Sequence, residues 1–384
     1  MRLTTTLLAT GLALISLPII AQEVASTDVG SLDGTPAVGQ ATAKEEPSFS
    51  LSGYADAYFQ HVLTDAKGAD GSPLTFPTSF AQETRGFGVG NVNLLAEKAL
   101  GKVGFVGQVG FGPRADAANG RFPNLQQLFV TYSPSDAITL TMGQFGTFVG
   151  YEVIDAVANM NYSTSYLFSY GPFFHTGLKA DFALGESFGA MVGVFNNTDS
   201  RFNDAGYYYG AQLSTETGGI AAYLNFLYGT DTEDVSGDDD ATTFQVDLTA
   251  TYEVSETIML GLNASRKSTE NLIDDESKVG HSDGFTGIAL YGTVGITDNA
   301  SLNLRSEYFV ESAPEDITLD GRGVFAITAS GNFNIGDLRI IPEFRFDSSA
   351  DFAGTYSDGI INYGTDNDED NSIATFIVAA VYAF

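Results

Sequence analysis

Charged side chains alternate with apolar ones in several segments that have the two-residue period of a β-strand. Arg305 and Glu307 lie on one such face, and Arg339, Glu343 and Arg345 lie on another. Fixed charges of both signs on one wall can attract and orient ions and hydrated solutes. Because such groups cannot cheaply face hydrocarbon, we expect them to line a water-filled interior.

In a strand, every second side chain points to the same face. This parity argument also places Arg85 and Lys179 among the inward-facing cations. Two interpretations of these cations stay open. In the first, the cations form a basic wall that selects solutes. In the second, each cation pairs with an inward acid, as Arg305 with Glu307 and Lys179 with Asp181. Strand parity cannot decide between these interpretations because it does not give the height of a side chain in the interior.

The segment 148–172 is long, rich in aromatic residues and poor in charge, which is unusual for a loop surrounded by water. Aromatic and amide side chains favour partial burial with their polar tips satisfied. We therefore predict that this loop, the third long one, folds into the interior and constricts it. The alternative is a loop packed on the rim with its acids solvated. The predicted constriction residues are Glu152, Asp155, Asn161, Tyr162 and Tyr166.

Catalytic chemistry has little support in this sequence. The three histidines are His61, His175 and His281, and no zinc-ligand spacing connects them. Gly185-Glu186-Ser187-Phe188-Gly189 has the Gly-x-Ser-x-Gly spacing, but it begins in a tight turn between two predicted strands, whereas a nucleophile elbow needs a turn from a strand into a helix. We predict that the protein is not an enzyme, has no cofactor and no metal site, and uses His175 structurally.

Two acidic clusters, 231–240 and 366–370, invite comparison with calcium loops. The second begins with carboxylates at alternate positions, but Asn371 stands where a calcium loop needs glycine and Ile377 where it needs glutamate. Solvated acidic loops that attract cations, or that bridge through divalent ions to lipopolysaccharide, are the favoured interpretation.

The elements that must position these residues are strands. Turn signals separate sixteen alternating runs, so the sequence predicts an all-β transmembrane antiparallel β-barrel of about 16 strands. The predicted strands are 49–62, 84–97, 102–112, 124–133, 137–147, 173–183, 188–196, 207–215, 220–229, 242–254, 258–267, 285–297, 301–312, 321–335, 338–348 and 372–384.

The connections between these runs alternate in length. Tight turns such as Ser255-Glu256 and Gly336-Asp337 are separated by long connections such as 63–83, 268–284 and 349–371. Short periplasmic turns and long extracellular loops are typical of outer-membrane barrels, and an even strand count returns both ends of the barrel to the periplasm.

Both ends of the chain agree with this placement. Residues 1–21 have a basic start, a short apolar run and a small residue at the end, which predicts a cleaved signal peptide. Residues 22–47 are predicted to be a flexible periplasmic tail, and 48–384 the barrel. Phe384 ends an alternating strand and resembles the terminal signature that the barrel-assembly machinery reads.

Composition excludes several classes. The formal net charge of −31 argues against nucleic-acid binding and favours cations. The chain has no cysteine, so it has neither disulfides nor thiol catalysis. It also has no tryptophan, so tyrosine and phenylalanine must form any interfacial aromatic belts.

One stretch resembles a known family. The residues Gly143-Gln144-Phe145-Gly146-Thr147, then Gly150-Tyr151-Glu152, Asn161-Tyr162-Ser163, Ser165 to Gly171 and His175-Thr176-Gly177 are similar to the OmpL-like β-barrel porin family. This motif covers 143–197, and the rest of the chain matches in architecture only. The resemblance implies an outer-membrane porin for small solutes and supplies no ligand or catalytic residues.

Together these observations predict passive diffusion of small hydrophilic solutes through the outer membrane of a Gram-negative bacterium, with mild cation preference. The expected partners are outer-membrane lipid, lipopolysaccharide, the assembly machinery and, in a homotrimer, two further copies. Two alternatives stay open. In a sugar-specific channel, Tyr162, Tyr166, Phe168 and Tyr170 would form a stacking track; a surface-interaction barrel would not conduct at all.

Overall fold

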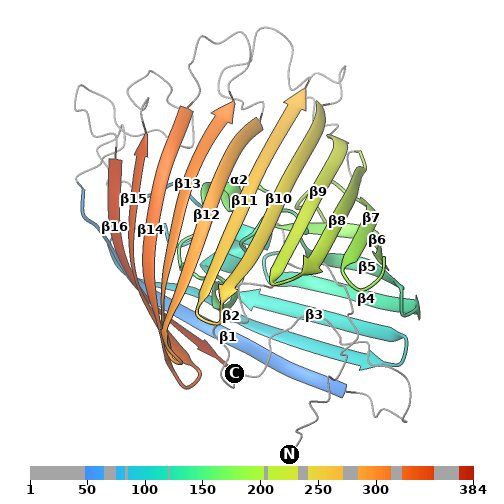
Figure 1. Cartoon of the computed structure of the whole chain (residues 1–384), viewed down its shortest axis with the longest axis horizontal. Coiled ribbons are helices and arrows are strands. Elements are labelled where there is room, and N and C mark those ends of the chain that lie inside the picture. The colour runs from blue at the N-terminus through green and yellow to red at the C-terminus, as the bar shows by residue number, and fades with distance from the viewer. Residues whose placement is uncertain are drawn as a thin grey trace, which may run out of the picture.

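The computed structural model describes most of the chain from residue 48 to its end (Figure 1). The described ranges are 48–64, 75–82, 85–119, 122–202, 206–231, 241–270, 284–312, 322–349 and 372–384. The predicted signal peptide and tail, the calcium-like cluster 366–370 and His281 lie outside these residues.

Sixteen strands form the wall, as the sequence predicts, and most boundaries agree within a few residues. The strands are β1 Ser48–Val62, β2 Arg85–Leu100, β3 Val103–Phe111, β4 Leu125–Ser135, β5 Ile138–Gly146, β6 Phe174–Ala183, β7 Phe188–Phe195, β8 Tyr208–Thr217, β9 Ile220–Asp231, β10 Ala241–Ser255, β11 Ile258–Glu270, β12 Gly284–Thr297, β13 Ala300–Ser312, β14 Arg322–Ile335, β15 Leu338–Ser349 and β16 Ser372–Ala383.

The sheet is one closed antiparallel barrel in which every strand pairs with its neighbours in sequence. The first and last strands close it, with Tyr54 opposite Ala383 and Val62 opposite Thr375. The Gly53 amide also donates to the Phe384 carbonyl oxygen over 2.9 Å. Closure leaves no strand edge with unpaired backbone groups, which a lipid environment requires.

The strands present apolar side chains outward and polar ones inward, as predicted. On β13, Leu302 and Leu304 are about half exposed, whereas Asn303, Arg305 and Glu307 are buried. This alternation runs with period two because successive side chains in a strand point to opposite faces. The charged residues of β13 in the sequence pattern therefore lie inside the barrel.

Strand β2 departs from simple alternation because it contains a β-bulge. Ala55 of β1 lies opposite Val92, but Ala57 lies opposite Val89, so two residues of β2 face Asp56 alone. The extra residue reverses the parity of every position before it. Arg85 consequently shares the outer face with Phe87, which is 90% exposed. The parity argument had placed Arg85 inside, and the bulge explains the difference.

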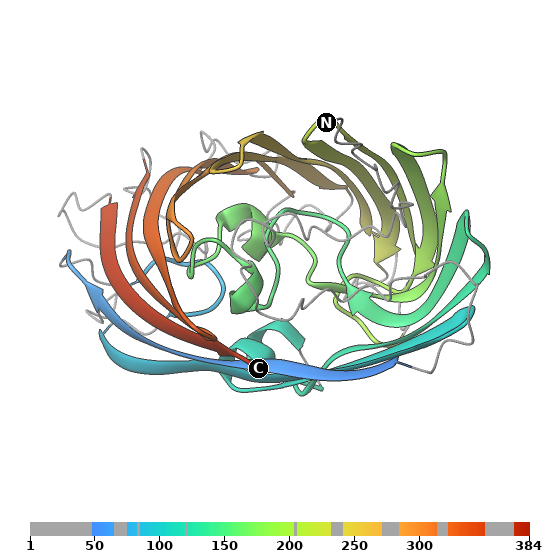
Figure 2. The same cartoon turned by 60° about the horizontal axis from the view of Figure 1, so that its bottom comes forward.

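Within the described part of the chain, three short helices lie in the connections. Helix α1, Pro113–Asn119, follows β3, while the 3₁₀ helix η1, Ala156–Ala158, and helix α2, Tyr166–Tyr170, lie between β5 and β6. No helix within the described residues is long and apolar enough to cross a membrane. The connection that carries η1 and α2 lies within the ring of strands (Figure 2).

Candidate functional site

The candidate site is the contact between the inner wall of the barrel and residues 147–173, which we call the inner loop. Helix α2 begins after Ser165, whose hydroxyl accepts a hydrogen bond from the Phe168 amide over 3.0 Å. This cap is a standard way to start a helix, and it fixes the chain direction in the middle of the loop.

One buried ion pair joins the inner loop to β13. Arg305 Nη1 lies 2.5 Å from Glu152 Oε1 and also donates to the Ser163 carbonyl oxygen over 2.7 Å. The other Glu152 oxygen accepts a hydrogen bond from the Ser165 amide over 2.6 Å. Both charged side chains are almost fully buried, so each one depends on the other for compensation.

Wall carboxylates hold the backbone of the inner loop. Glu343 accepts hydrogen bonds from the Tyr162 and Ser163 amides over 2.7 and 3.0 Å. Glu307 accepts from the Tyr166 and Leu167 amides, each over 2.8 Å. In each case the two carboxylate oxygens take one amide each. These hydrogen bonds to charged acceptors are stronger than neutral ones.

Asp155 has a different environment, because neutral side chains donate its hydrogen bonds. Its Oδ1 atom accepts from Tyr54 Oη, Gln126 Nε2 and Asn93 Nδ2 over 3.0, 2.9 and 3.4 Å. Its Oδ2 atom accepts from Gln108 Nε2 over 2.9 Å. Neutral donors stabilise the carboxylate without cancelling its charge, so Asp155 contributes a net negative charge to the interior.

Another wall carboxylate, Asp56 on β1, binds the inner loop at Tyr162. Tyr162 Oη donates to Asp56 Oδ2 over 2.6 Å, and Arg114 Nη2 of α1 lies 3.9 Å from the same oxygen. The guanidinium of Arg114 also lies over the rings of Phe80 and Tyr162. Burial raises the pKa of the Tyr162 hydroxyl well above its ordinary value, so this group remains a donor to Asp56.

Two further arginines of β15 hold carbonyl groups of the inner loop. Arg345 donates to the Thr164 carbonyl oxygen over 2.8 Å and is held by Asp347 through its Nε atom. Arg339 donates to the carbonyl oxygens of Ala156 and Val157. These arginines had been predicted to line the pore, and the structure places their polar atoms against the inner loop.

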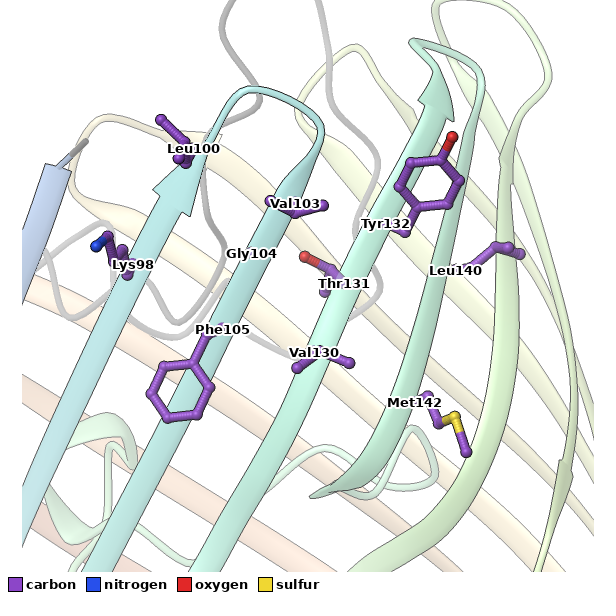
Figure 3. A pocket seen from close by; sticks show the side chains of 10 residues that line it. All are labelled: Lys98, Leu100, Val103, Gly104, Phe105, Val130, Thr131, Tyr132, Leu140 and Met142. Atoms are coloured by element: carbon purple, nitrogen blue, oxygen red, sulfur yellow. The ribbon is translucent and has the colours of Figure 1, made fainter. Parts of the chain in front are cut away.

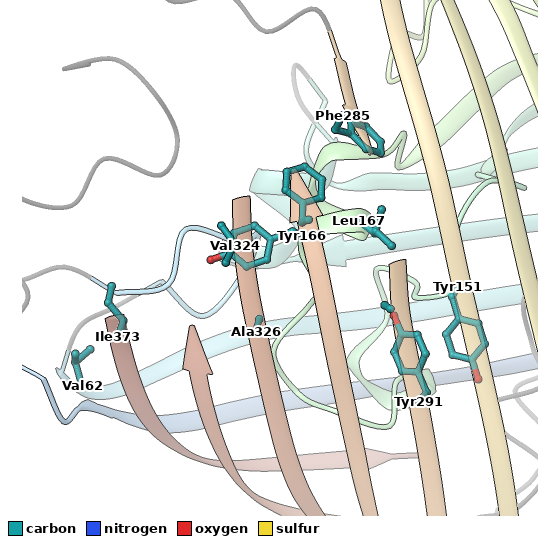
Figure 4. Close-up of a cluster of buried hydrophobic side chains, with 11 residues drawn as sticks. Val62, Tyr151, Tyr166, Leu167, Phe285, Tyr291, Val324, Ala326 and Ile373 are labelled. Carbon is teal, nitrogen blue, oxygen red and sulfur yellow. The ribbon is translucent and has the colours of Figure 1, made fainter. Parts of the chain in front are cut away.

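Aromatic side chains cover the remaining contact area. Tyr151 stacks on Tyr291 with ring centroids 4.2 Å apart, and Tyr166 stacks on Phe309 at 5.7 Å. Together with Leu167 and Phe285 they belong to one buried cluster between the inner loop and the β12–β14 wall (Figure 4). Tyr162 and Tyr166 have no exposed surface.

The predicted site residues thus fall into three groups. Glu152, Asp155, Asn161, Tyr162 and Tyr166 meet the wall, where Asn161 donates to Ser330 Oγ over 2.6 Å. Arg305, Glu307, Arg339, Glu343 and Arg345 meet the inner loop from the other side. Lys179 pairs with Asp181 within the wall at 3.0 Å, and Arg85 lies outside.

Sequence reasoning missed Asp56 and Asp247 as site residues. Asp247 on β10 accepts from the Gly150 amide over 3.0 Å and from Asn225 and Asn263. Both aspartates alternate with outward apolar residues, so strand parity could have identified them. Their loop partners could not be read from the sequence, because a backbone amide carries no sequence signal.

Carboxyl side chains outnumber cationic ones among the buried residues of the interior. Among the described residues, the buried charged side chains comprise eight carboxylates and four cationic groups. The carboxylates are Asp56, Glu152, Asp181, Asp247, Glu307, Glu311, Glu343 and Asp347, and the cations are Arg114, Lys179, Arg305 and Arg345.

Comparison with known proteins agrees with this architecture. The model of the family described as "Putative beta-barrel porin-2, OmpL-like" matches residues 48–384. No protein of curated function matches the sequence. Several solved structures are similar in fold at low sequence identity.

An anion-selective porin from Comamonas acidovorans has a TM-score of 0.60 at 15% identity, covering 88% of this chain and 100% of its own. The trimer form of OmpT from Vibrio cholerae has a TM-score of 0.57 at 13% identity, with coverage of 88% and 100%. The channel DcaP of Acinetobacter baumannii has a TM-score of 0.56 at 13% identity, with coverage of 89% and 99%. At these identities the likeness concerns the fold alone.

Proposed function

The chain belongs to the OmpL-like β-barrel porin-2 family, and on that premise we propose that it is an outer-membrane porin for passive diffusion of small hydrophilic solutes. The single observation that carries this proposal is a closed 16-strand barrel whose inner wall is polar and charged and holds an inner loop. Sixteen strands enclose enough space for an aqueous channel, and the inner loop narrows that space.

The proposed channel prefers cations mildly. The excess of buried carboxylates supports this preference, and Asp155 supports it most directly because neutral donors leave its charge in place. Glu152 contributes less, because Arg305 compensates it. The anion selectivity of the Comamonas porin belongs to that protein and does not transfer at 15% identity.

Asp155→Asn is expected to reduce cation preference while leaving the barrel folded. The amide keeps one acceptor oxygen for the surrounding donors but removes a unit charge. A charge a few ångströms from a permeating ion is worth ~1 kcal/mol in aqueous surroundings, so the cation-to-anion permeability ratio should fall by up to about fivefold. The reversal potential in a potassium chloride gradient measures this ratio.

Asp136→Asn is the matched control for that variant. Asp136 is exposed in the short turn between β4 and β5, away from the inner loop. It should leave the reversal potential unchanged. An Asp155→Asn channel with the wild-type reversal potential would remove Asp155 from the selectivity account.

A sugar-specific channel is the second candidate, and one observation argues against its simplest form. A stacking track must expose its aromatic faces to the solute. Tyr162 and Tyr166 have no exposed surface and pack against the wall, which leaves Tyr170 as the partly exposed member of the proposed track. Saturable transport would have to use other residues.

A non-conducting surface-interaction barrel is the third candidate. The observation that favours it is the density of the loop contacts: charged residues of β1, β10, β13 and β15 all bond to the inner loop. In this account the loop would act as a plug. The family and the porin-like fold favour a channel over this reading and over an enzyme.

The proposed partners follow from the proposed location in the outer membrane. Outer-membrane lipid and lipopolysaccharide would contact the apolar outer face, and the assembly machinery would read the C-terminal strand that ends in Phe384. A homotrimer is proposed as well, because one similar structure, OmpT, is recorded in a trimer form. Predicted signal-peptide cleavage after residue 21 completes this account.

Swelling of liposomes that contain the refolded protein tests the proposed function. Uncharged sugars of increasing size should enter at rates that fall with size and rise linearly with concentration. Saturation by one sugar would instead support the specific channel. Absence of swelling with a barrel shown to be folded would contradict the porin and favour the plugged barrel.

A further inference from the structure

A shallow hollow lies on the outer face of the barrel, over strands β2 to β5. It has a volume of about 530 Å³, and its lining includes Leu100, Phe105, Val130, Tyr132 and Met142 (Figure 3). Most outward side chains of the described strands are apolar. This hollow differs because a charged residue, Lys98, also lines it.

Lys98 faces outward and lies among aromatic rings. It follows the β2 bulge on the same parity as Leu100, which is about half exposed. In the register it stands opposite Phe49 of β1 and Phe105 of β3. Among the described strand residues on the outer face, Lys98 is the one charged side chain in the half of the barrel that carries the short turns.

The position of Lys98 along the strand places it at a membrane interface. It lies two residues before the end of β2, beside the short turn that carries Lys102. Short turns of outer-membrane barrels face the periplasm, so this end meets the periplasmic leaflet, which consists of phospholipid. Long lysine side chains near an interface extend their ammonium group to headgroup level.

Because the chain is strongly acidic, Lys98 is a local site at which the outer face can attract an anionic headgroup. A protein with a formal net charge of −31 repels anionic headgroups over most of its surface. Lys98 reverses that repulsion at one point, and Lys102 adds a second cation in the adjoining turn, where its Nζ atom donates to the Pro134 carbonyl oxygen. An ammonium group has three donors, so Lys102 keeps two for a further acceptor.

We propose that this hollow binds an anionic phospholipid of the periplasmic leaflet, with an acyl chain in the hollow and the phosphate on Lys98. The apolar lining matches the acyl chain, and the cation at the interface matches the phosphate. This inference uses the outer-membrane placement of the proposed function but does not require conduction, so the two can fail separately.

The absence of tryptophan from the chain makes a direct test possible, because one introduced tryptophan is the sole indole fluorophore. Tyr132→Trp places the reporter in the hollow. Tyr252→Trp is the matched control: both tyrosines face outward, lie three residues before the end of their strand, and are 48% and 45% exposed. Tyr252 lies on β10, away from Lys98.

Each reporter protein is refolded into phosphatidylcholine vesicles that contain brominated phosphatidylglycerol or brominated phosphatidylcholine, and quenching is measured. One lysine near a membrane surface is worth ~1 kcal/mol toward an anionic lipid, so quenching at Tyr132→Trp should show about fivefold preference for phosphatidylglycerol. Lys98→Gln should abolish that preference and Lys98→Arg should retain it. Tyr252→Trp should show none.

Three results would overturn the proposal. Equal preference at both reporters would mean ordinary annular lipid. A Tyr132→Trp reporter that neither lipid quenches would mean that another copy of the chain covers this face. A preference that survives Lys98→Gln would remove the lysine from recognition. None of these readouts depends on channel activity.

Discussion

Arg305→Met is expected to destabilise the barrel and to release the inner loop from its β13 anchor. The substitution preserves much of the side-chain volume but leaves Glu152 buried without its cation. Breaking a buried ion pair by removing one partner costs about 3–5 kcal/mol. It also removes the donor to the Ser163 carbonyl oxygen, so the loop loses two contacts at once. We expect lower unfolding free energy in urea and larger, noisier single-channel conductance.

Two further variants separate these effects. Lys179→Met breaks a similarly buried pair, Lys179 with Asp181, that lies within the wall. It should lower stability without changing conductance. Adding Glu152→Gln to Arg305→Met removes the uncompensated charge and should recover part of the stability. A conductance for Arg305→Met equal to that of Lys179→Met would contradict the proposed anchoring of the loop.

Combined replacement of Glu307 and Glu343 by glutamine is expected to loosen the middle of the inner loop. Each carboxylate accepts two loop amides through separate oxygens, whereas glutamine offers one acceptor oxygen and places an NH₂ group against the second amide. A hydrogen bond to a charged group is worth about 1.5–3 kcal/mol, so local opening should become at least about tenfold more frequent.

Hydrogen exchange at the amides of Tyr162, Ser163, Tyr166 and Leu167 measures this opening. Asp181→Asn is the control, because it changes a buried wall carboxylate that pairs with Lys179. Its loop amides should exchange at the wild-type rate. Unchanged exchange in the double variant would show that aromatic packing, and not the wall carboxylates, fixes the loop.

Much of the fold could be predicted because membrane strands obey a strict rule. Hydrocarbon excludes charge from one face of each strand, so Arg305 and Glu307 had to lie on the inner face opposite to Leu302 and Leu304. The closed 16-strand barrel follows from the number of such runs. The Arg85 error came from the bulge beside Asp56, which inserts one residue and leaves no clear mark in the alternation.

Most members of the site were predicted from the sequence, but Asp56, Asp247 and the pairings were not. Parity identified Arg305 and Glu343, and the composition of the loop identified Glu152, yet Arg305 pairs with Glu152 of the loop and not with Glu307 of its own strand. Glu307 and Glu343 bind backbone amides, which have no residue identity. Such partners depend on the path of the inner loop through the barrel, and that path is set by many weak contacts together.

Single-channel recording of the refolded protein in a planar bilayer with a potassium chloride gradient tests the central claim most directly. The account predicts discrete conductance steps whose reversal potential lies on the cation side, because carboxylates exceed cationic groups in the interior. A folded barrel that gives no steps, or steps that reverse on the anion side, would contradict it.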